Sequence, residues 1–192
     1  MEVTGRGRKT ALSLSPGRLA PRSSAFDLRQ GEGVRKSLVA EFRAGGKPLF
    51  VIANHWTSKW DDERAFGAHQ PPTTPTAAKR EAQGKVVRGF VDQLLERNRD
   101  ARVVVLGDLN EALPFAGVAA LSAPPMANLA LGLDLGDRYS FNFEGSSDLL
   151  DHIVVSPSLA KGAELDIVHV NSNCPDSVRT SDHDPVVARV RL

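Results

Sequence analysis

Apolar residues along this chain occur in short groups whose spacing changes from one segment to the next. Between residues 77 and 98 they recur every three or four positions, which predicts an amphipathic helix. The polar face of this helix carries Lys79, Arg80, Lys85, Arg88 and Glu96. The run Val-Val-Val-Leu at 103–106 is continuous instead, and it predicts a strand buried on both faces of a sheet.

The remaining elements follow from shorter patterns. Segments 37–42 and 49–54, separated by a Gly-Gly pair at 45–46, predict a β-hairpin. Further strands are expected at 139–143, 149–156, 165–171 and 186–192, and a short helix at 114–121. The mixed order of strands and helices, with the late strands close together, indicates an α/β (α+β) layered sandwich.

Two segments do not follow these patterns. Residues 1–36 have no sustained apolar period and are expected to form an irregular N-terminal arm, which leaves 37–192 as the folded part. Residues 61–75 form a long polar loop, and such loops inside compact domains are usually functional or mobile.

The composition excludes some classes of protein but does not indicate one particular function. The 192 residues suffice for one domain, and 41% hydrophobic and 24% charged residues are ordinary for a globular protein. The net charge of +1 weakens the case for a pure nucleic-acid binder but permits an enzyme that grips a few phosphates. The single cysteine excludes an intrachain disulfide and a cysteine-based zinc site. No apolar run is long enough for a membrane span, and residues 1–10 do not form a signal peptide.

The sequence Gly-Asp-Leu-Asn at 107–110 follows the predicted buried strand at its carboxyl end, where open α/β sheets usually place their sites. Asp108 and Asn110 are two residues apart, so in an extended segment both point to the same side. Together they offer a carboxylate and an amide to one phosphate. The alternative is that Asp108 only organises a turn.

Asp151 enters an apolar strand, where an acidic side chain costs several kcal/mol unless it has a partner. His152 points to the opposite face and is interpreted as a hydrogen-bonded packing histidine. Near the C-terminus, Asp182 is available as a metal ligand, and His183 beside it is a candidate base or hydrogen-bond donor. The alternative is a polar turn before the last strand, to which Asp184 is assigned.

His55 follows an apolar strand and would project from its end, although a single histidine in such a place is more often structural. His69 and His169 are left without a role. An oxygen-rich candidate set with few histidines suits a hard cation such as Mg²⁺, Mn²⁺ or Ca²⁺ better than zinc.

Taken in order, Asn-His at 54–55, Gly-Asp-Leu-Asn at 107–110, Leu-Asp-His-Ile at 150–153 and Ser-Asp-His-Asp-Pro at 181–185 resemble the motifs of the endonuclease/exonuclease/phosphatase superfamily. Ser-Pro-Gly-Arg at 15–18, Ser-Lys at 58–59 and Gln-Pro-Pro at 70–72 look like its bacterial extracellular-nuclease branch. The resemblance implies a four-layered α/β/β/α sandwich with a divalent cation, most often Mg²⁺, and a secreted or periplasmic location.

The resemblance also assigns roles, and it implies a metal-dependent nuclease that acts on DNA or RNA. By this resemblance Asp182 is a metal ligand, Asp108 and Asn110 position the phosphate and the attacking water, and His183 contacts the scissile phosphate. Asp151 would orient His183, and His55 would be the second catalytic histidine of a deoxyribonuclease I-type site. Arg35 would lie near the substrate phosphate.

The family also carries an upstream asparagine and a metal-binding glutamate that have no counterpart here. We therefore expect the C-terminal part of such a domain, completed by self-association or by a missing N-terminal half. Other activities remain open: a phosphomonoesterase, a phospholipid phosphodiesterase, or an inactive fragment that serves as an interaction module.

Overall fold

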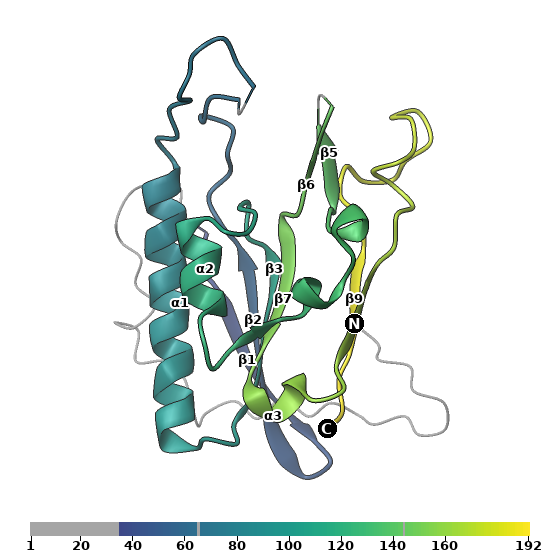
Figure 1. Ribbon diagram of the computed structural model, residues 1–192. Helices are drawn as coiled ribbons and strands as arrows, with labels where there is room; N and C mark the ends of the chain where they lie inside the picture. Colours follow the sequence, from purple (N-terminus) through teal and green to yellow (C-terminus); the bar gives the residue numbers. More distant parts are fainter. Residues whose placement is uncertain (1–34, 65, 144) are drawn as a thin grey trace.

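The computed structural model of the protein describes residues 35–64, 66–143 and 145–192 (Figure 1). A five-stranded sheet runs through its centre in the order β1-β2-β3-β7-β4. These strands are β1 (Leu38–Ala44), β2 (Lys47–His55), β3 (Arg102–Asp108), β7 (Asp151–Val155) and β4 (Ala127–Asn128). Strands β2 and β3 are parallel, and the other neighbouring pairs are antiparallel.

The turn between β1 and β2 confirms the predicted hairpin. Gly45 and Gly46 both have positive φ values, +59° and +77°. A tight hairpin turn that matches the right-handed twist of its strands needs positive φ at both central residues, which glycine adopts without strain. The hairpin brings the start of β1 to the carboxyl end of β2, because Leu38 pairs with Ala53.

Two helices cover one face of the sheet. They are α1 (Ala77–Arg97) and α2 (Ala116–Ser122), and their apolar side chains join those of β2 and β3 in the main core. Ile52, Val103 and Val105 are fully buried there. The predicted long helix is therefore confirmed, but its buried face includes Arg80, which the periodicity had placed on the polar side.

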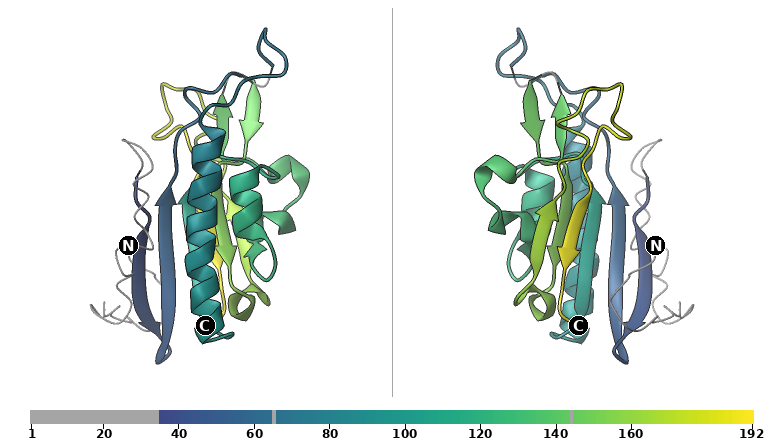
Figure 2. Two further views of the ribbon diagram at one scale, coloured as in Figure 1. Left: turned by 90° about the vertical axis from the view of Figure 1, so that its left-hand side faces the viewer. Right: turned by 90° about the vertical axis from the view of Figure 1, so that its right-hand side faces the viewer.

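A two-stranded sheet lies on the opposite face. It consists of β8 (Glu164–Ile167) and β9 (Val186–Arg189), and Leu165 and Val186 pack against Ile153 and Val155 of β7. The short helix α3 (Pro157–Ala160) closes this second core with Leu159. The helices, the central sheet and this smaller sheet form successive layers (Figure 1). Viewed along the stack, β1 and β2 extend beyond the smaller sheet (Figure 2). The layered α+β fold class is thus as predicted.

Several boundaries differ from the sequence-based expectations. The strand expected at 165–171 ends at Ile167, because Val170 N–H turns back to bond the carbonyl of Val168. The strand expected at 139–143 is the short β5 (Phe141–Phe143), which pairs with an unforeseen β6 (Ser146–Asp148). Strand β3 is fully buried on one face only, since Val104 and Leu106 are partly exposed.

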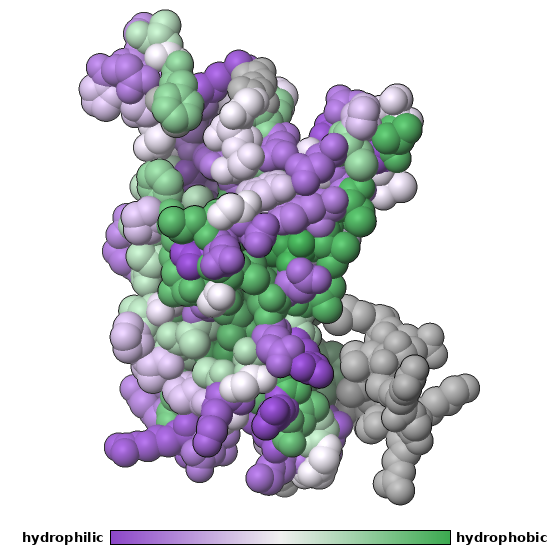
Figure 3. Space-filling view, turned by 45° about the vertical axis from the view of Figure 1, so that its right-hand side comes forward, coloured by the Kyte–Doolittle hydropathy of each residue, from purple (hydrophilic) through white to green (hydrophobic). Residues whose placement is uncertain are grey.

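Two 3₁₀ helices, η1 (Leu129–Gly132) and η2 (Leu135–Asp137), follow β4. Figure 3 shows apolar residues gathered across the middle of the face that carries them, where Leu131 and Leu135 are 54% and 83% exposed. The motif at 15–18 and the arm predicted at 1–36 lie outside the described residues, apart from Arg35 and Lys36. Within the part that the structure describes, no helix has the length and apolar character needed to cross a membrane.

Candidate active site

Three polar residues lie side by side across the central sheet. His55 ends β2 and pairs in register with Asp108 at the end of β3, and Asp108 pairs with Asp151 at the start of β7. Directly paired residues project to the same face of a sheet, so the three side chains share one face. His55 Nε2 lies 3.5 Å from Asp108 Oδ2, and the His55 side chain is about half exposed.

The glycine before Asp108 is required by the close approach of β2. Gly107 has a φ of +123°, and a Cβ at this position would lie 2.1 Å from the carbonyl oxygen of Asn54. Any other residue would therefore push β2 and β3 apart just where the polar row begins. This contact explains the Gly-Asp pair at the end of the buried strand.

Asn110 holds the Asp108 carboxylate in place. Its backbone N–H donates to Asp108 Oδ1 at 2.8 Å, and its side-chain Nδ2 donates to Asp108 Oδ2 at 3.1 Å. The same Nδ2 also lies 3.2 Å from the carbonyl oxygen of Trp56. Asn110 adopts a φ of +50°, a left-handed conformation that asparagine tolerates better than most residues. The structure thus joins the two residues that their spacing had paired.

Asp151 and His183 form a tight pair on the other side of Asp108. His183 Nδ1 lies 2.6 Å from Asp151 Oδ2, and Ser140 Oγ donates to the same carboxylate oxygen at 2.7 Å. Ser140, which the sequence did not single out, also accepts the backbone N–H of Asp151. One ligand atom each of Asp108, Asp151 and His183 lies within 4.8 Å of the others, so the three form a single group.

Burial and neighbouring charges raise the pKa values of Asp108 and His183. Burial raises the pKa of Asp108, and the negative charge of Asp151 raises it further, against the opposing hydrogen bond from Asn110. The hydrogen bond to Asp151 raises the pKa of His183, and it outweighs the effect of burial. Asp108 is therefore a stronger base than an exposed aspartate, and His183 more readily carries a proton.

Two predicted site residues lie outside this group. Asp182 is exposed next to His183, and its negative charge contributes to the raised pKa of His183. Arg35 is exposed just before β1, at the sheet end where Ser37 Oγ donates to Asn54 Oδ1 at 2.6 Å. The structure thus brings His55, Asp108, Asn110, Asp151 and His183 together, with Asp182 and Arg35 at the same end of the molecule.

The histidine next to Asp151 has a packing role, as interpreted from its face of the strand. His152 is 1% exposed, with Nε2 2.9 Å from the carbonyl oxygen of Glu111 and Nδ1 3.0 Å from Asn128 Nδ2. Burial lowers its pKa. A neutral ring with the proton on Nε2 satisfies both contacts.

The assignment of Asp184 to a simple turn was wrong. Asp184 is 3% exposed and accepts hydrogen bonds from the backbone N–H groups of Asn171 and Ser172. Ser172 Oγ and His169 Nδ1 contact its second oxygen. Burial opposes ionisation, yet these hydrogen bonds lower the pKa of Asp184 to about 2. Asp184 therefore holds the segment that carries His183 in place, and His169 contributes to this through its contact with Asp184.

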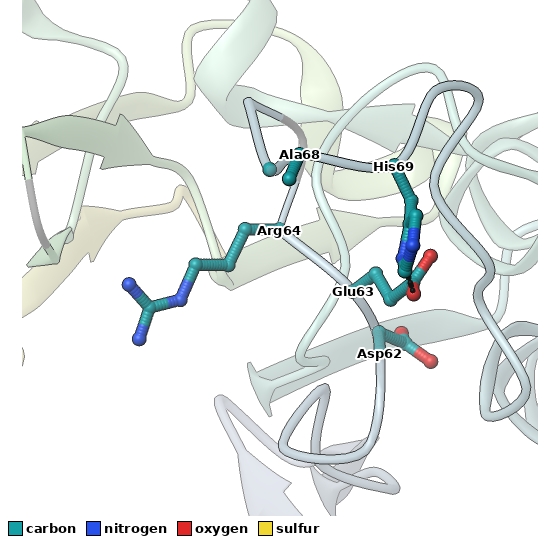
Figure 4. A pocket seen from close by; sticks show the side chains of 6 residues that line it. Asp62, Glu63, Arg64, Ala68 and His69 are labelled. Carbon is teal, nitrogen blue, oxygen red and sulfur yellow. Dashed lines mark hydrogen bonds and ion pairs between the residues drawn. The ribbon is translucent and has the colours of Figure 1, made fainter.

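Arg80 organises the loop that leads from β2 to α1. Its side chain is buried and donates to Asp62 Oδ2 at 2.7 Å, with Glu111 Oε1 at 3.4 Å. Helical periodicity had placed this residue on the polar face, because its partners are far away in the sequence. Further along the same loop, His69 Nδ1 lies 3.0 Å from Glu63 Oε1 in an exposed hydrogen bond, and Arg64 points away from it (Figure 4).

The residues present fit a hard divalent cation. Asp108 and Asp151 are two carboxylates in one group whose mutual repulsion a cation would offset, and their oxygen ligands suit Mg²⁺. If Asp151 and His183 both bound the ion, the 2.6 Å hydrogen bond between them would have to break. Asp182, the ligand predicted from the sequence, lies beside His183 and outside this group, so its carboxylate takes no part in that hydrogen bond.

Fold and site together define an α+β sandwich with an Asp–His pair and an Asp–Asn pair at one end of its sheet. The sequence pattern of the Endonuclease/Exonuclease/phosphatase family matches residues 30–175, and the chain belongs to this family. No curated protein matches the chain.

Several solved structures share the fold. A truncated TDP2 from Caenorhabditis elegans has a TM-score of 0.63 at 19% identity, covering 85% of this chain and 63% of that one. TDP2 from D. rerio complexed with single strand DNA product has a TM-score of 0.56 at 20% identity, covering 84% and 63%. Sphingomyelinase C from Streptomyces griseocarneus has a TM-score of 0.55 at 20% identity, covering 80% and 57%. The chain therefore spans less than two thirds of each structure.

Proposed function

We propose that this chain carries the site of a metal-dependent phosphodiester hydrolase, and that the enzyme is a nuclease acting on DNA or RNA. The observation that carries the proposal is the 2.6 Å contact between Asp151 and His183 beside the carboxylate of Asp108. This group combines a fixed proton donor with a base of raised pKa, and hydrolysis at phosphorus needs both.

In this proposal, His183 keeps Nδ1 on Asp151 and donates from Nε2 to a non-bridging phosphate oxygen, where negative charge accumulates. Asp108 accepts a proton from the attacking water. The new bond between water oxygen and phosphorus forms as the bond to the leaving oxygen breaks, and the leaving oxygen takes up a proton from solvent. Asn110 keeps Asp108 oriented, while His55 and Arg35 contact the phosphate.

A divalent ion held by Asp182, with Mg²⁺ preferred and Mn²⁺ or Ca²⁺ as alternatives, would act as a Lewis acid that stabilises charge on the phosphoryl oxygens. A nucleic acid is the preferred substrate because a structural neighbour, TDP2 from D. rerio, was solved with a single strand DNA product. The bacterial extracellular-nuclease branch and a secreted or periplasmic location remain predictions from the motifs alone.

A phospholipid phosphodiester is the second candidate substrate. Two large apolar side chains of the loop that follows β2, Trp60 and Phe66, are 86% and 92% exposed, as residues that meet a lipid surface would be. The sphingomyelinase C neighbour has nearly the same structural similarity as TDP2 from D. rerio.

The test is hydrolysis of plasmid DNA, RNA, sphingomyelin vesicles and bis(p-nitrophenyl) phosphate, each with Mg²⁺, Mn²⁺, Ca²⁺ or excess chelator. We expect metal-dependent cleavage of a nucleic acid and of the small diester. His183→Ala should remove it, while His69→Gln, a change at an exposed loop histidine, should not. Cleavage of no phosphodiester by a folded chain would reject the proposal.

A further inference from the structure

A series of flat side chains leads outward from His183. The ring of Phe141 lies 4.9 Å from the His183 ring, between centroids, at an angle of 43°. Phe143, two residues further along β5, lies 6.0 Å from Phe141 at only 22°. The guanidinium of Arg64 lies 5.7 Å from the centroid of Phe143. We call Phe141, Phe143 and Arg64 the stacking platform.

Hydrogen bonds and an ion pair from the β5–β6 hairpin to two loops hold the stacking platform in place. Asn142 projects from the opposite face of β5 and donates to the carbonyl oxygen of Ser172 at 3.0 Å, so the two phenyl rings are turned away from that loop. On the other strand of the hairpin, Asp148 pairs in register with Phe141 and binds Lys59 Nζ at 3.2 Å. The hairpin is therefore tied to the loop after β2, which also supplies Arg64 (Figure 4).

The surface of the platform suits a flat, apolar ring joined to an anion. Phe143 leaves 49% of its surface exposed, although burying such a ring is favourable. Arg64 places its positive charge over the ring of Phe143, and Lys59, which is paired with Asp148, adds a second cation to the loop that meets the hairpin. An unpaired nucleobase offers a ring for Phe143 and a phosphate for these cations, and aromatic stacking of this kind is tolerant of base identity.

We propose that the stacking platform binds unpaired bases next to the scissile phosphate, and that the chain therefore acts on single-stranded nucleic acid in preference to duplex. Bases inside a duplex are stacked on each other and present no free face to Phe143. The inference rests on the proposed nuclease function, since it names the form of nucleic acid that the site takes. A lipid surface is the competing partner, because it too would bury an exposed phenylalanine.

The experiment compares a single-stranded oligonucleotide, the same sequence as a duplex, sphingomyelin vesicles and bis(p-nitrophenyl) phosphate. The variants are Phe143→Ala, Phe143→Tyr and Phe115→Ala. Phe115 is a fair control because it is 57% exposed at the start of α2, on the helical face of the sheet. Binding of labelled oligonucleotide is followed in parallel by fluorescence anisotropy in chelator, so the inference is tested without turnover.

We expect the wild-type chain to prefer the single strand. Phe143→Ala should weaken binding of the single strand and raise KM on it roughly 5- to 150-fold, as the loss of one stacked base predicts, more than it affects the small diester. Phe143→Tyr should keep the binding and the KM of the wild type, because it retains an aromatic ring. Phe115→Ala should change neither quantity.

Three results would overturn the inference: a preference for duplex, equal losses on the oligonucleotide and the small diester, or a loss confined to vesicles. Failure of the wild type to cleave any diester, with Phe143-dependent binding of the single strand intact, would reject only the nuclease function.

Discussion

Replacing Asp151 by asparagine is the sharpest test of the Asp–His pair. The substitution keeps the size of the side chain and leaves an oxygen that can still accept the hydrogen bond of Ser140. It removes the negative charge that faces His183 Nδ1 at 2.6 Å. The change is therefore electrostatic and orientational rather than a loss of packing.

The expected magnitude follows from this one contact. A hydrogen bond that involves a charged group contributes about 1.5–3 kcal/mol, and each 1.36 kcal/mol changes a rate tenfold. If the charge of Asp151 acts mainly in the transition state, kcat/KM should fall roughly 10- to 150-fold. The fall should occur mainly in kcat, because His183 is proposed to bind charge that forms during the reaction.

The assay is initial-rate hydrolysis of bis(p-nitrophenyl) phosphate with saturating Mg²⁺. Thermal melting of each variant checks that the fold is intact. Asp166→Asn is the matched control, since it makes the same chemical change on an exposed residue of β8. A folded Asp151→Asn variant whose kcat/KM stays within about threefold of the wild type would refute the idea that the pair assists the reaction.

Four further outcomes are expected. Hydrolysis should stop in excess chelator and return on adding Mg²⁺, and full activity in chelator would exclude the metal. Burial lowers the pKa of His152 in the folded protein, so as the pH falls the unfolded chain binds a proton at this histidine before the folded chain does. The free energy of unfolding should therefore decrease as the pH drops below 6.5. Melting curves of His152→Gln should lose that pH dependence, with activity retained. Arg80→Met removes the cation that faces the buried carboxylates of Asp62 and Glu111 and should cost about 3–5 kcal/mol in denaturant unfolding, unlike Lys79→Met on the exposed side. Light scattering should show more than one chain per particle, and Leu38→Glu, at a position 69% exposed on β1, should reduce it.

Strong local patterns were enough to predict the main elements. The apolar period of α1, the valine run of β3 and the Gly-Gly turn each act within a few residues, so the sequence shows them directly. Short elements such as β6 were missed, because Ser146–Asp148 is polar and depends on β5 for its hydrogen bonds.

The sequence indicated the residues of the candidate site whose motifs lie next to a strand, but not the supporting residues whose partners are distant in the sequence. Asp108, Asn110, Asp151 and His183 could be named because the family motifs mark them. Arg80 and Asp184 could not be understood from periodicity or turn patterns. The charged partners of Arg80 lie 18 and 31 positions away, and the partners of Asp184 include residues 12 to 15 positions away. Only the folded chain shows that these charges are buried and satisfied.

The row His55, Asp108 and Asp151 has a consequence for how this chain tolerates change. The three residues stand at matching positions of three neighbouring strands, so their alignment depends on strand register and not on a flexible loop. Inserting or deleting one residue within β3 would turn Asp108 toward the helices and bring the valines of the main core to the face of the smaller sheet. Sheet assembly and chemistry would be lost together. Measurable turnover would therefore indicate that β2, β3 and β7 have paired in the correct register, because only that register aligns His55, Asp108 and Asp151.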